Sequence, residues 1–271
     1  MKKPEKGSPT QNHLILLTND DGIYSEGLTI LREHLEHFAD IFIVAPDREK
    51  SATSLSLTLH RPLRVKRIKQ DTFAVDGTPA DCVYLAVQKL LPRKPSLLIS
   101  GLNHGPNLGQ QDISYSGTVA GARQGAFLGI PSAAISVLHD QDKQYAFEFS
   151  ARAASSLVRK LLDHKLPPGI SLSINIPPPP VKGMKIVKLG QKRYNPKIIR
   201  KKDPRQNFYY WIGTGTPQAI GDKNSDVNII KKGYITLTPL QTDLTDHPSL
   251  KLDWLKDLRL NLDHEIIQKA V

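Results

Sequence analysis

Two adjacent carboxylates, Asp20 and Asp21, follow directly after an apolar run in the segment LILLTNDDG. Residues 14–17 are typical of a buried strand, and Gly22 marks the turn that ends it. Two like charges at a strand end repel each other and lose water, and a hard divalent ion neutralises such a pair well. A polar turn in which an Asp caps the next helix is the simpler alternative.

Polar clusters also follow two further apolar runs, in the segments APDREKS after residues 41–45 and SGLNHGPN after residues 97–100. Because right-handed connections place the carboxyl ends of parallel strands at one edge of a sheet, we expect the three clusters to meet there. The available ligand atoms are all oxygens, which favours Mg²⁺, Mn²⁺ or Ca²⁺ over zinc. We therefore predict one divalent-metal site, with the ligands Asp20, Asp21, Ser51 and Asn103.

A fourth polar segment, SYSGTVAGARQGAFLG, predicts a helix that begins near Ser116 and is rich in small residues. A helix N-terminus offers free backbone N–H groups and the positive end of a dipole, which suit a phosphate. The small residues predict close packing of this helix on the sheet. Ordinary capping by Ser116 or Thr118 is the alternative, but beside a divalent ion phosphate binding is the better interpretation.

These polar segments are positioned by an alternation of strand-like and helix-like segments in the first half of the chain. Thr78 and Pro79 are typical of a helix start, and LRVKRIKQDTFAVDG suggests a hairpin or edge strands. Together the alternating segments predict a parallel, doubly wound α/β sheet. The other expected strands are 14–18, 41–45, 97–100 and IPSAAISV, and the other expected helices are 25–38 and 145–163.

The second half of the chain changes character after the proline run in SLSINIPPPPV. Residues 182–205 contain ten Lys or Arg and one acid, and the aromatic segment NFYYWIG follows. This stretch predicts a β-hairpin arm or an exposed insertion, GYITLTPL predicts a late strand, and the last 20 residues show a helical pattern. We expect a mobile tail over 1–12, a catalytic core over 13–180 and a C-terminal extension over 181–271.

Composition places the chain among ordinary globular proteins, with 39% hydrophobic and 23% charged residues. No apolar stretch reaches the roughly 18 residues that span a bilayer, and no signal peptide is evident, so we expect no membrane contact. The single cysteine, Cys82, lies in an apolar helix pattern that predicts a buried core residue and agrees with a cytoplasmic location. The net charge of +11 favours anionic partners in general.

The quoted segments resemble the SurE family of stationary-phase survival proteins, which are metal-dependent 5′-nucleotidases. The resemblance implies a Rossmann-like domain with a C-terminal arm exchanged in homodimers or homotetramers, and a Mg²⁺ or Mn²⁺ ion held by the four ligands named above. It also implies hydrolysis of nucleoside 5′- or 3′-monophosphates, with some activity on short polyphosphate. The matching segments are ILLTNDDGIYSEGL, VAPDREKSATSLSLT, VDGTPADCVYLA, ISGLNHGPNLGQQDISYSGTVAGARQGAFLGIPSAAIS and ITLTPLQTDLTDH.

One departure from the family pattern is visible after the ligand Ser51, where Ala52 replaces the usual Gly. If this position needs a positive φ, Ala52 strains the loop, and we expect a small local adjustment. Two other residues keep two interpretations each. His104 is either a proton donor to the leaving group or a loop residue facing solvent, and Arg48 contacts either a phosphate or its acidic neighbours.

The predicted chemistry is hydrolysis of a phosphomonoester, in which Asp20 and Asp21 hold the metal. Which of the two also handles a proton is left open. The phosphate oxygens are expected to contact Asn107, Ser116, Gly117 and Thr118. Among the rivals, a nucleic-acid-binding protein fits the basic segment KIIRKKDPR, although we do not expect a nucleic acid partner; a non-catalytic nucleotide sensor also fits. A dinucleotide-dependent oxidoreductase lacks the glycine-rich motif after the first strand.

Overall fold

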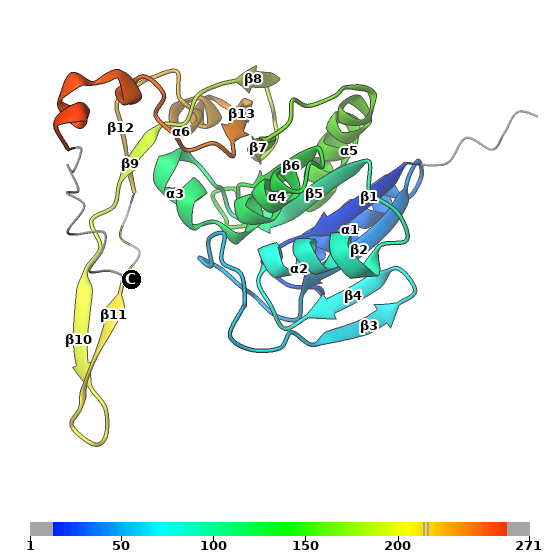
Figure 1. The fold of residues 1–271 in the computed structure, drawn as a ribbon, viewed down its shortest axis with the longest axis horizontal. Helices are drawn as coiled ribbons and strands as arrows, with labels where there is room; N and C mark the ends of the chain where they lie inside the picture. Colours follow the sequence, from blue (N-terminus) through cyan, green and yellow to red (C-terminus); the bar gives the residue numbers. More distant parts are fainter. Residues whose placement is uncertain (1–12, 214, 216, 259–271) are drawn as a thin grey trace, which may run out of the picture.

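The computed structural model describes residues 13–213, 215 and 217–258, and its main feature is a nine-stranded sheet with helices on both faces (Figure 1). The strands of this sheet are β1 (Leu14–Thr18), β2 (Asp40–Pro46), β3 (Val65–Lys69), β4 (Thr72–Val75), β5 (Leu97–His104), β6 (Ser132–Val137), β7 (Ile170–Ile176), β8 (Met184–Ile186) and β13 (Ile235–Gln241). Their order in space is β3-β4-β2-β1-β5-β6-β7-β13-β8.

The helices cover the two faces in pairs. The α-helices are α1 (Glu26–Leu35), α2 (Pro79–Leu85), α3 (Gly109–Tyr115), α4 (Gly117–Phe127), α5 (Phe147–Asp163) and α6 (Asp226–Ile229). A π-helical turn, η1 (Ala86–Leu90), continues α2, and short 3₁₀ helices are η2 (Ile230–Lys232), η3 (Ser249–Lys251) and η4 (Asp253–Leu258). Helices α1 and α5 pack together on one face of the sheet, and α2 and α4 pack together on the other.

The sheet is doubly wound, because the side of the sheet to which successive strands are added changes at β1. The chain passes from β1 to β2 on one side and later returns to place β5 on the other side of β1. Strands β2, β1, β5, β6 and β7 are all parallel, whereas β3 and β13 are antiparallel to their neighbours β4 and β7. The prediction of a doubly wound, mostly parallel α/β sheet is therefore confirmed, and the carboxyl ends of β1 and β5 flank the switch point.

Local sequence explains the elements nearest this point. All five residues of β1 are buried, because helices cover both faces of a parallel sheet and its strands read as continuous apolar runs. The buried face of α1 carries Leu28, Leu31 and Leu35, as the helical spacing predicts. At the start of α2, Thr78 and Asp81 cap each other's backbone N–H group, with Pro79 in the first turn. Cys82 is buried and free, as expected, and the cytoplasmic location stays a prediction.

Helix α3 and the end of strand β5, both close to the switch point, differ from the expectation. Helix α3 lies between the polar cluster SGLNHGPN and the helix expected to begin near Ser116, where no helix was predicted. The segment GQQDISY has no apolar periodicity, and only Gly109 and Ile113 of α3 are buried. A contact distant in sequence holds its start, where the backbone N–H of Gly109 donates to Asp226 Oδ2 at 2.7 Å. Strand β5 also runs past Ser100 to His104, because pairing with β6 resumes after a bulge, so Asn103 belongs to the strand end.

The basic and aromatic segment forms a β-hairpin that projects from the main body (Figure 1). Its strands β10 (Ile198–Lys202) and β11 (Phe208–Ile212) pair with each other, and at its root β9 (Gln191–Arg193) pairs with β12 (Gln218–Ile220). Strands β9 to β12 and the segments that join them are called the arm below. The predicted hairpin and the predicted late strand, β13, are confirmed, whereas the use of the arm in oligomerisation stays a prediction.

The two ends of the chain are only partly covered by the structure. Of the predicted C-terminal helix, the structure describes the 3₁₀ helix η4, whereas residues 259–271 and the predicted tail 1–12 lie outside the described residues. Among the residues that are described, no helix is long and apolar enough to cross a membrane.

Candidate functional site

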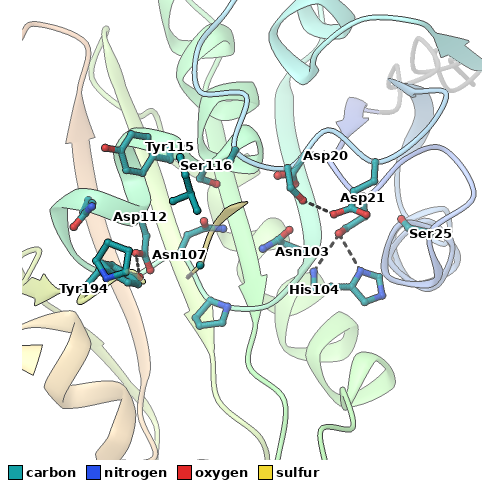
Figure 2. A pocket seen from close by; sticks show the side chains of 18 of the residues that line it. Asp20, Asp21, Ser25, Asn103, His104, Asn107, Asp112, Tyr115, Ser116 and Tyr194 are labelled. Carbon is teal, nitrogen blue, oxygen red and sulfur yellow. Dashed lines mark hydrogen bonds and ion pairs between the residues drawn. The ribbon is translucent and has the colours of Figure 1, made fainter. Parts of the chain in front are cut away.

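A cavity of about 1100 Å³ lies at the carboxyl ends of β1 and β5 (Figure 2). The predicted metal ligands and two of the predicted phosphate contacts line it: Asp20, Asp21, Ser51, Asn103, Asn107 and Ser116. The other two predicted phosphate contacts, Gly117 and Thr118, are not part of this lining and lie against Asp20. The parallel topology therefore brings the predicted residues together at one edge of the sheet, as expected.

Backbone hydrogen bonds tie the strand ends to one another. The N–H of Lys50 donates to the carbonyl of Asp20 at 2.7 Å, and the N–H of Ile23 donates to the carbonyl of Pro46 at 2.8 Å. The N–H of Ser54 donates to the carbonyl of Tyr115 at 2.9 Å. The loop that carries Ser51 is thus held between the end of β1 and the end of α3.

Asp20 is a buried carboxylate, with 6% of its surface exposed. Burial raises the pKa of Asp20 to about 6, and the nearby charge of Asp21 adds to the rise. The hydroxyl of Thr118 donates to Oδ1 of Asp20 and acts in the opposite direction. An ionised carboxylate at this position is under-compensated by the protein alone, which is the environment that a divalent cation fits.

Asp21 is held by both the backbone and the side chain of His104 (Figure 2). Its Oδ2 accepts from the backbone N–H of His104 at 3.1 Å and lies 3.0 Å from the ring atom Nδ1. The hydrogen bond to Asp21 raises the pKa of His104. The ring of His104 also packs edge-on against Phe147, and its side chain is 33% exposed, so it is not a freely solvated loop residue. A role as proton donor stays a prediction.

The two neutral candidate ligands are oriented by short local contacts. The hydroxyl of Ser51 donates to Glu49 Oε1 at 2.6 Å, and Nδ2 of Asn103 donates to the carbonyl of Gly105 at 2.7 Å, which leaves the Asn103 amide oxygen for a ligand. Ala52 has a φ of 55°, so this position does adopt the positive φ under which a residue other than Gly strains the loop. The expected small local adjustment stays a prediction. In the part of the chain that the structure describes, no three His, Cys, Asp or Glu side chains gather to hold a metal, so a cation here depends on these neutral oxygens too.

The start of α4 presses directly on Asp20. Ser116 caps the helix, since its hydroxyl accepts from the N–H of Val119 at 3.1 Å. A Cβ on Gly117 would lie 2.8 Å from Cβ of Asp20, and a Cβ on Gly121 would lie 2.8 Å from Oγ of Ser100. The predicted close packing is confirmed, whereas the side chain of Thr118 is buried against Asp20 and does not face the cavity as a phosphate ligand would.

Asn107 and Arg48 complete the set of predicted contacts. Asn107 is buried, and its Nδ2 donates to the hydroxyl of Ser136 at 2.8 Å, which fixes the side chain at the cavity wall. Arg48 instead pairs with Asp47 at 2.7 Å and lines a different, smaller cavity. Of its two interpretations, contact with an acidic neighbour is therefore the one that the structure bears out.

The far wall of the cavity was not predicted. It consists of residues from α3 and from the arm, and these include Tyr115, Tyr194, Pro196, Ile212 and Gly213. No motif or spacing in the sequence links these two segments, because they meet only through tertiary contacts.

Comparisons with known proteins agree with this geometry. A family model described as Survival protein SurE matches residues 15–196. The 5′-nucleotidase SurE of Mannheimia succiniciproducens is 42% identical over 247 residues, which cover 89% of this chain and 98% of that protein. The 5′-nucleotidase SurE of Pelotomaculum thermopropionicum is 45% identical over 240 residues, which cover 86% of this chain and 91% of that protein.

A solved structure supports the same assignment. The crystal structure of the SurE protein from Aquifex aeolicus matches with a TM-score of 0.77 and 38% sequence identity, and the match covers 90% of this chain and all of that chain. With a family model matching residues 15–196 and relatives above 40% identity over most of its length, the chain belongs to the SurE family.

Proposed function

We propose that this chain hydrolyses nucleoside 5′-monophosphates to nucleoside and phosphate in a reaction that requires one divalent ion, Mg²⁺ or Mn²⁺. The relatives named 5′-nucleotidase SurE support the substrate class. The observation that supports the metal requirement is the burial of the Asp20 carboxyl group, which is 6% exposed and whose pKa is raised to about 6 mainly by that burial. The carboxyl group of Asp21 lines the same end of the cavity.

The residues present fit a hard divalent ion. Its ligands would be Asp20, Asp21, Ser51 and Asn103, all of which offer oxygen atoms at the cavity wall. When bound there, the ion would offset negative charge on the phosphoryl group and lower the pKa of a water molecule.

The chain's own residues would bind and orient the phosphate. Ser116, the N-cap of α4, and Asn107 line the cavity next to Asp20 and would contact the phosphate oxygens. Water adds to phosphorus as the ester P–O bond breaks, and the nucleoside leaves as an alcohol after taking up a proton. Thr118 and His104 act as positioning residues, because they hold Asp20 and Asp21.

A panel of phosphate-release assays tests this proposal. Nucleoside 5′-monophosphates, 3′-monophosphates and short polyphosphate would be offered with Mg²⁺, Mn²⁺ or EDTA, and we propose activity on all three classes. EDTA should abolish phosphate release and Mn²⁺ should restore it. The rate of phosphate release should fall in both Asp20→Asn and Asp21→Asn. The fall should exceed the roughly 10- to 100-fold decrease that follows when a residue supporting a metal ligand is lost. Asp163→Asn, at the exposed end of α5, is the matched control.

Several outcomes would refute the proposal. Release of phosphate at the wild-type rate by either carboxylate variant, or in EDTA, would contradict a metal-dependent reaction. Tight nucleotide binding without phosphate release would instead indicate a sensor, and salt-sensitive binding of RNA that is indifferent to both carboxylates would indicate a nucleic-acid-binding protein.

The arm supports a further proposal, that this chain forms a homodimer or homotetramer. Strands β10 and β11 expose large apolar side chains, including Trp211 at 62% and Ile212 at 79%. A two-stranded hairpin is marginal in water, and an apolar surface of this kind marks a contact with another chain. Light scattering should show an oligomer for the wild type and a smaller species for Trp211→Ser; equal masses would contradict a role of the hairpin.

A further inference from the structure

The cavity is larger than a phosphate group alone requires. Its volume of about 1100 Å³ is at the upper end of cavities that enclose whole small-molecule ligands. Figure 2 shows the carboxylates Asp20 and Asp21 at one end and the rings of Tyr115 and Tyr194 at the other. A substrate whose phosphate lies beside the carboxylates therefore extends toward two aromatic side chains.

Tyr194 is locked in place by a small polar network. Its hydroxyl donates to Oδ1 of Asp112, and Oδ2 of Asp112 pairs with the ammonium group of Lys192. The side chain of Lys192 is only 9% exposed, so this pair is largely shielded from water. Burial and the hydrogen bond to Asp112 raise the pKa of Tyr194, and the ring stays neutral. A ring fixed in this way loses little freedom when a ligand packs on it.

The rest of the far wall is also without a net charge. Tyr115 lies at the end of α3 with 56% of its surface exposed, and Ile212 and Gly213 come from the arm. The charge of Lys192 is balanced by Asp112. Such a wall suits a flat, uncharged, aromatic group, because every nucleobase has a π-face that stacks on tyrosine.

We propose that Tyr115 and Tyr194 form a nucleobase subsite at the end of the cavity opposite the carboxylates. This inference rests on the proposed nucleotidase activity and names the part of the substrate that the arm and α3 recognise. The rival explanation is structural, in that the Asp112 network only fastens the arm to α3.

Steady-state kinetics with two substrates separate these explanations. Adenosine 5′-monophosphate and ribose 5-phosphate carry the same sugar phosphate, and only the first has a base. Tyr194→Leu should lower kcat/KM for adenosine 5′-monophosphate roughly ten-fold more than for ribose 5-phosphate, within the range measured for base stacking on aromatic side chains. Tyr194→Phe keeps the ring and should retain most of the preference.

Two further variants complete the design. Tyr84→Leu removes an exposed tyrosine of α2 that lies outside the cavity and should change neither substrate. If circular dichroism shows that Tyr194→Leu does not fold, Tyr115→Leu, at an exposed position, gives the same comparison and the same expected loss of preference.

Each outcome decides the question. An equal loss for both substrates, or an unchanged ratio, would overturn the nucleobase subsite while leaving the nucleotidase activity intact. A wild-type preference ratio near one would overturn it as well. Wild-type protein that releases phosphate from neither substrate with Mn²⁺ would refute the proposed function, and this subsite with it.

Discussion

Replacing Asp20 by Asn should stabilise the metal-free protein even though it removes a proposed metal ligand. The side chain keeps its size and loses a charge that burial makes costly. The pKa of Asp20 is raised from its ordinary value of 3.8 to about 6. At about 1.4 kcal/mol per pH unit, this rise corresponds to about 3 kcal/mol of lost stability.

The effect has a defined dependence on pH. Above about pH 6 the carboxyl is ionised in both the folded and the unfolded chain, so the folded chain carries the full cost. Below pH 3.8 it is protonated in both, and the cost vanishes. The gain in unfolding free energy from Asp20→Asn should therefore be about 3 kcal/mol at pH 7.5 and about 1 kcal/mol at pH 4.5.

Urea denaturation in EDTA at these two pH values measures the effect. Asp47→Asn is the matched control, because pairing with Arg48 lowers the pKa of Asp47 and loss of that charge should give no gain. Mn²⁺ at about 100 times its dissociation constant should then stabilise the wild type by about 2.7 kcal/mol and leave Asp20→Asn unchanged. An Asp20→Asn variant no more stable than the wild type in EDTA at pH 7.5 would refute the reasoning.

Three other substitutions test the supports of the site. Thr118→Val removes the hydroxyl that donates to Asp20 and should weaken Mn²⁺ binding by calorimetry roughly ten-fold, as the loss of a hydrogen bond to a charged group implies; Thr118→Ser should bind as the wild type does. Gly117→Ala brings a Cβ within 3.1 Å of the Lys50 carbonyl and should lower the unfolding free energy by about 1–3 kcal/mol in urea; an unchanged value would show that the backbone can move aside. Asp226→Ala leaves the buried N–H groups of Gly109 and Gly190 without their acceptor and should expose the root of the arm to limited proteolysis, whereas Asp226→Asn keeps one acceptor and should be cut more slowly.

The parts of the fold that follow local rules could be predicted from the sequence. Three elements are predicted by patterns within a few residues of each other. These patterns are the apolar run of β1, the leucine spacing of α1 and the capping residues of α2. Helix α3 does not, because it starts at a glycine with a φ of +75° and is held by Asp226, more than a hundred residues away. Helix α3 depends on the contact between Gly109 and Asp226, which no local sequence pattern predicts.

The candidate site also combines features that could be predicted from the sequence with features that could not. Strand ends of a parallel sheet meet at one edge, so the grouping of Asp20, Asp21, Ser51 and Asn103 around one cavity could be predicted from order alone. The contact between Thr118 and Asp20 could not, because it depends on how closely the glycines of α4 approach the sheet. Tyr194 could not either, since its position is set by a hydrogen bond to Asp112.

The two ends of the cavity are made at different times during synthesis. The residues of its carboxylate end have all left the ribosome once residue 118 has emerged, and β7 then completes a set of six parallel strands. The tyrosine wall needs residue 194, and its anchor to α3 needs Asp226, so it forms only when the last third of the chain emerges. Chains fold from the N-terminus as they are made, so one edge of β7 stays unpaired until β13 has been synthesised and pairs with it. A growing chain therefore receives the residues of the proposed metal site before those of the proposed nucleobase subsite.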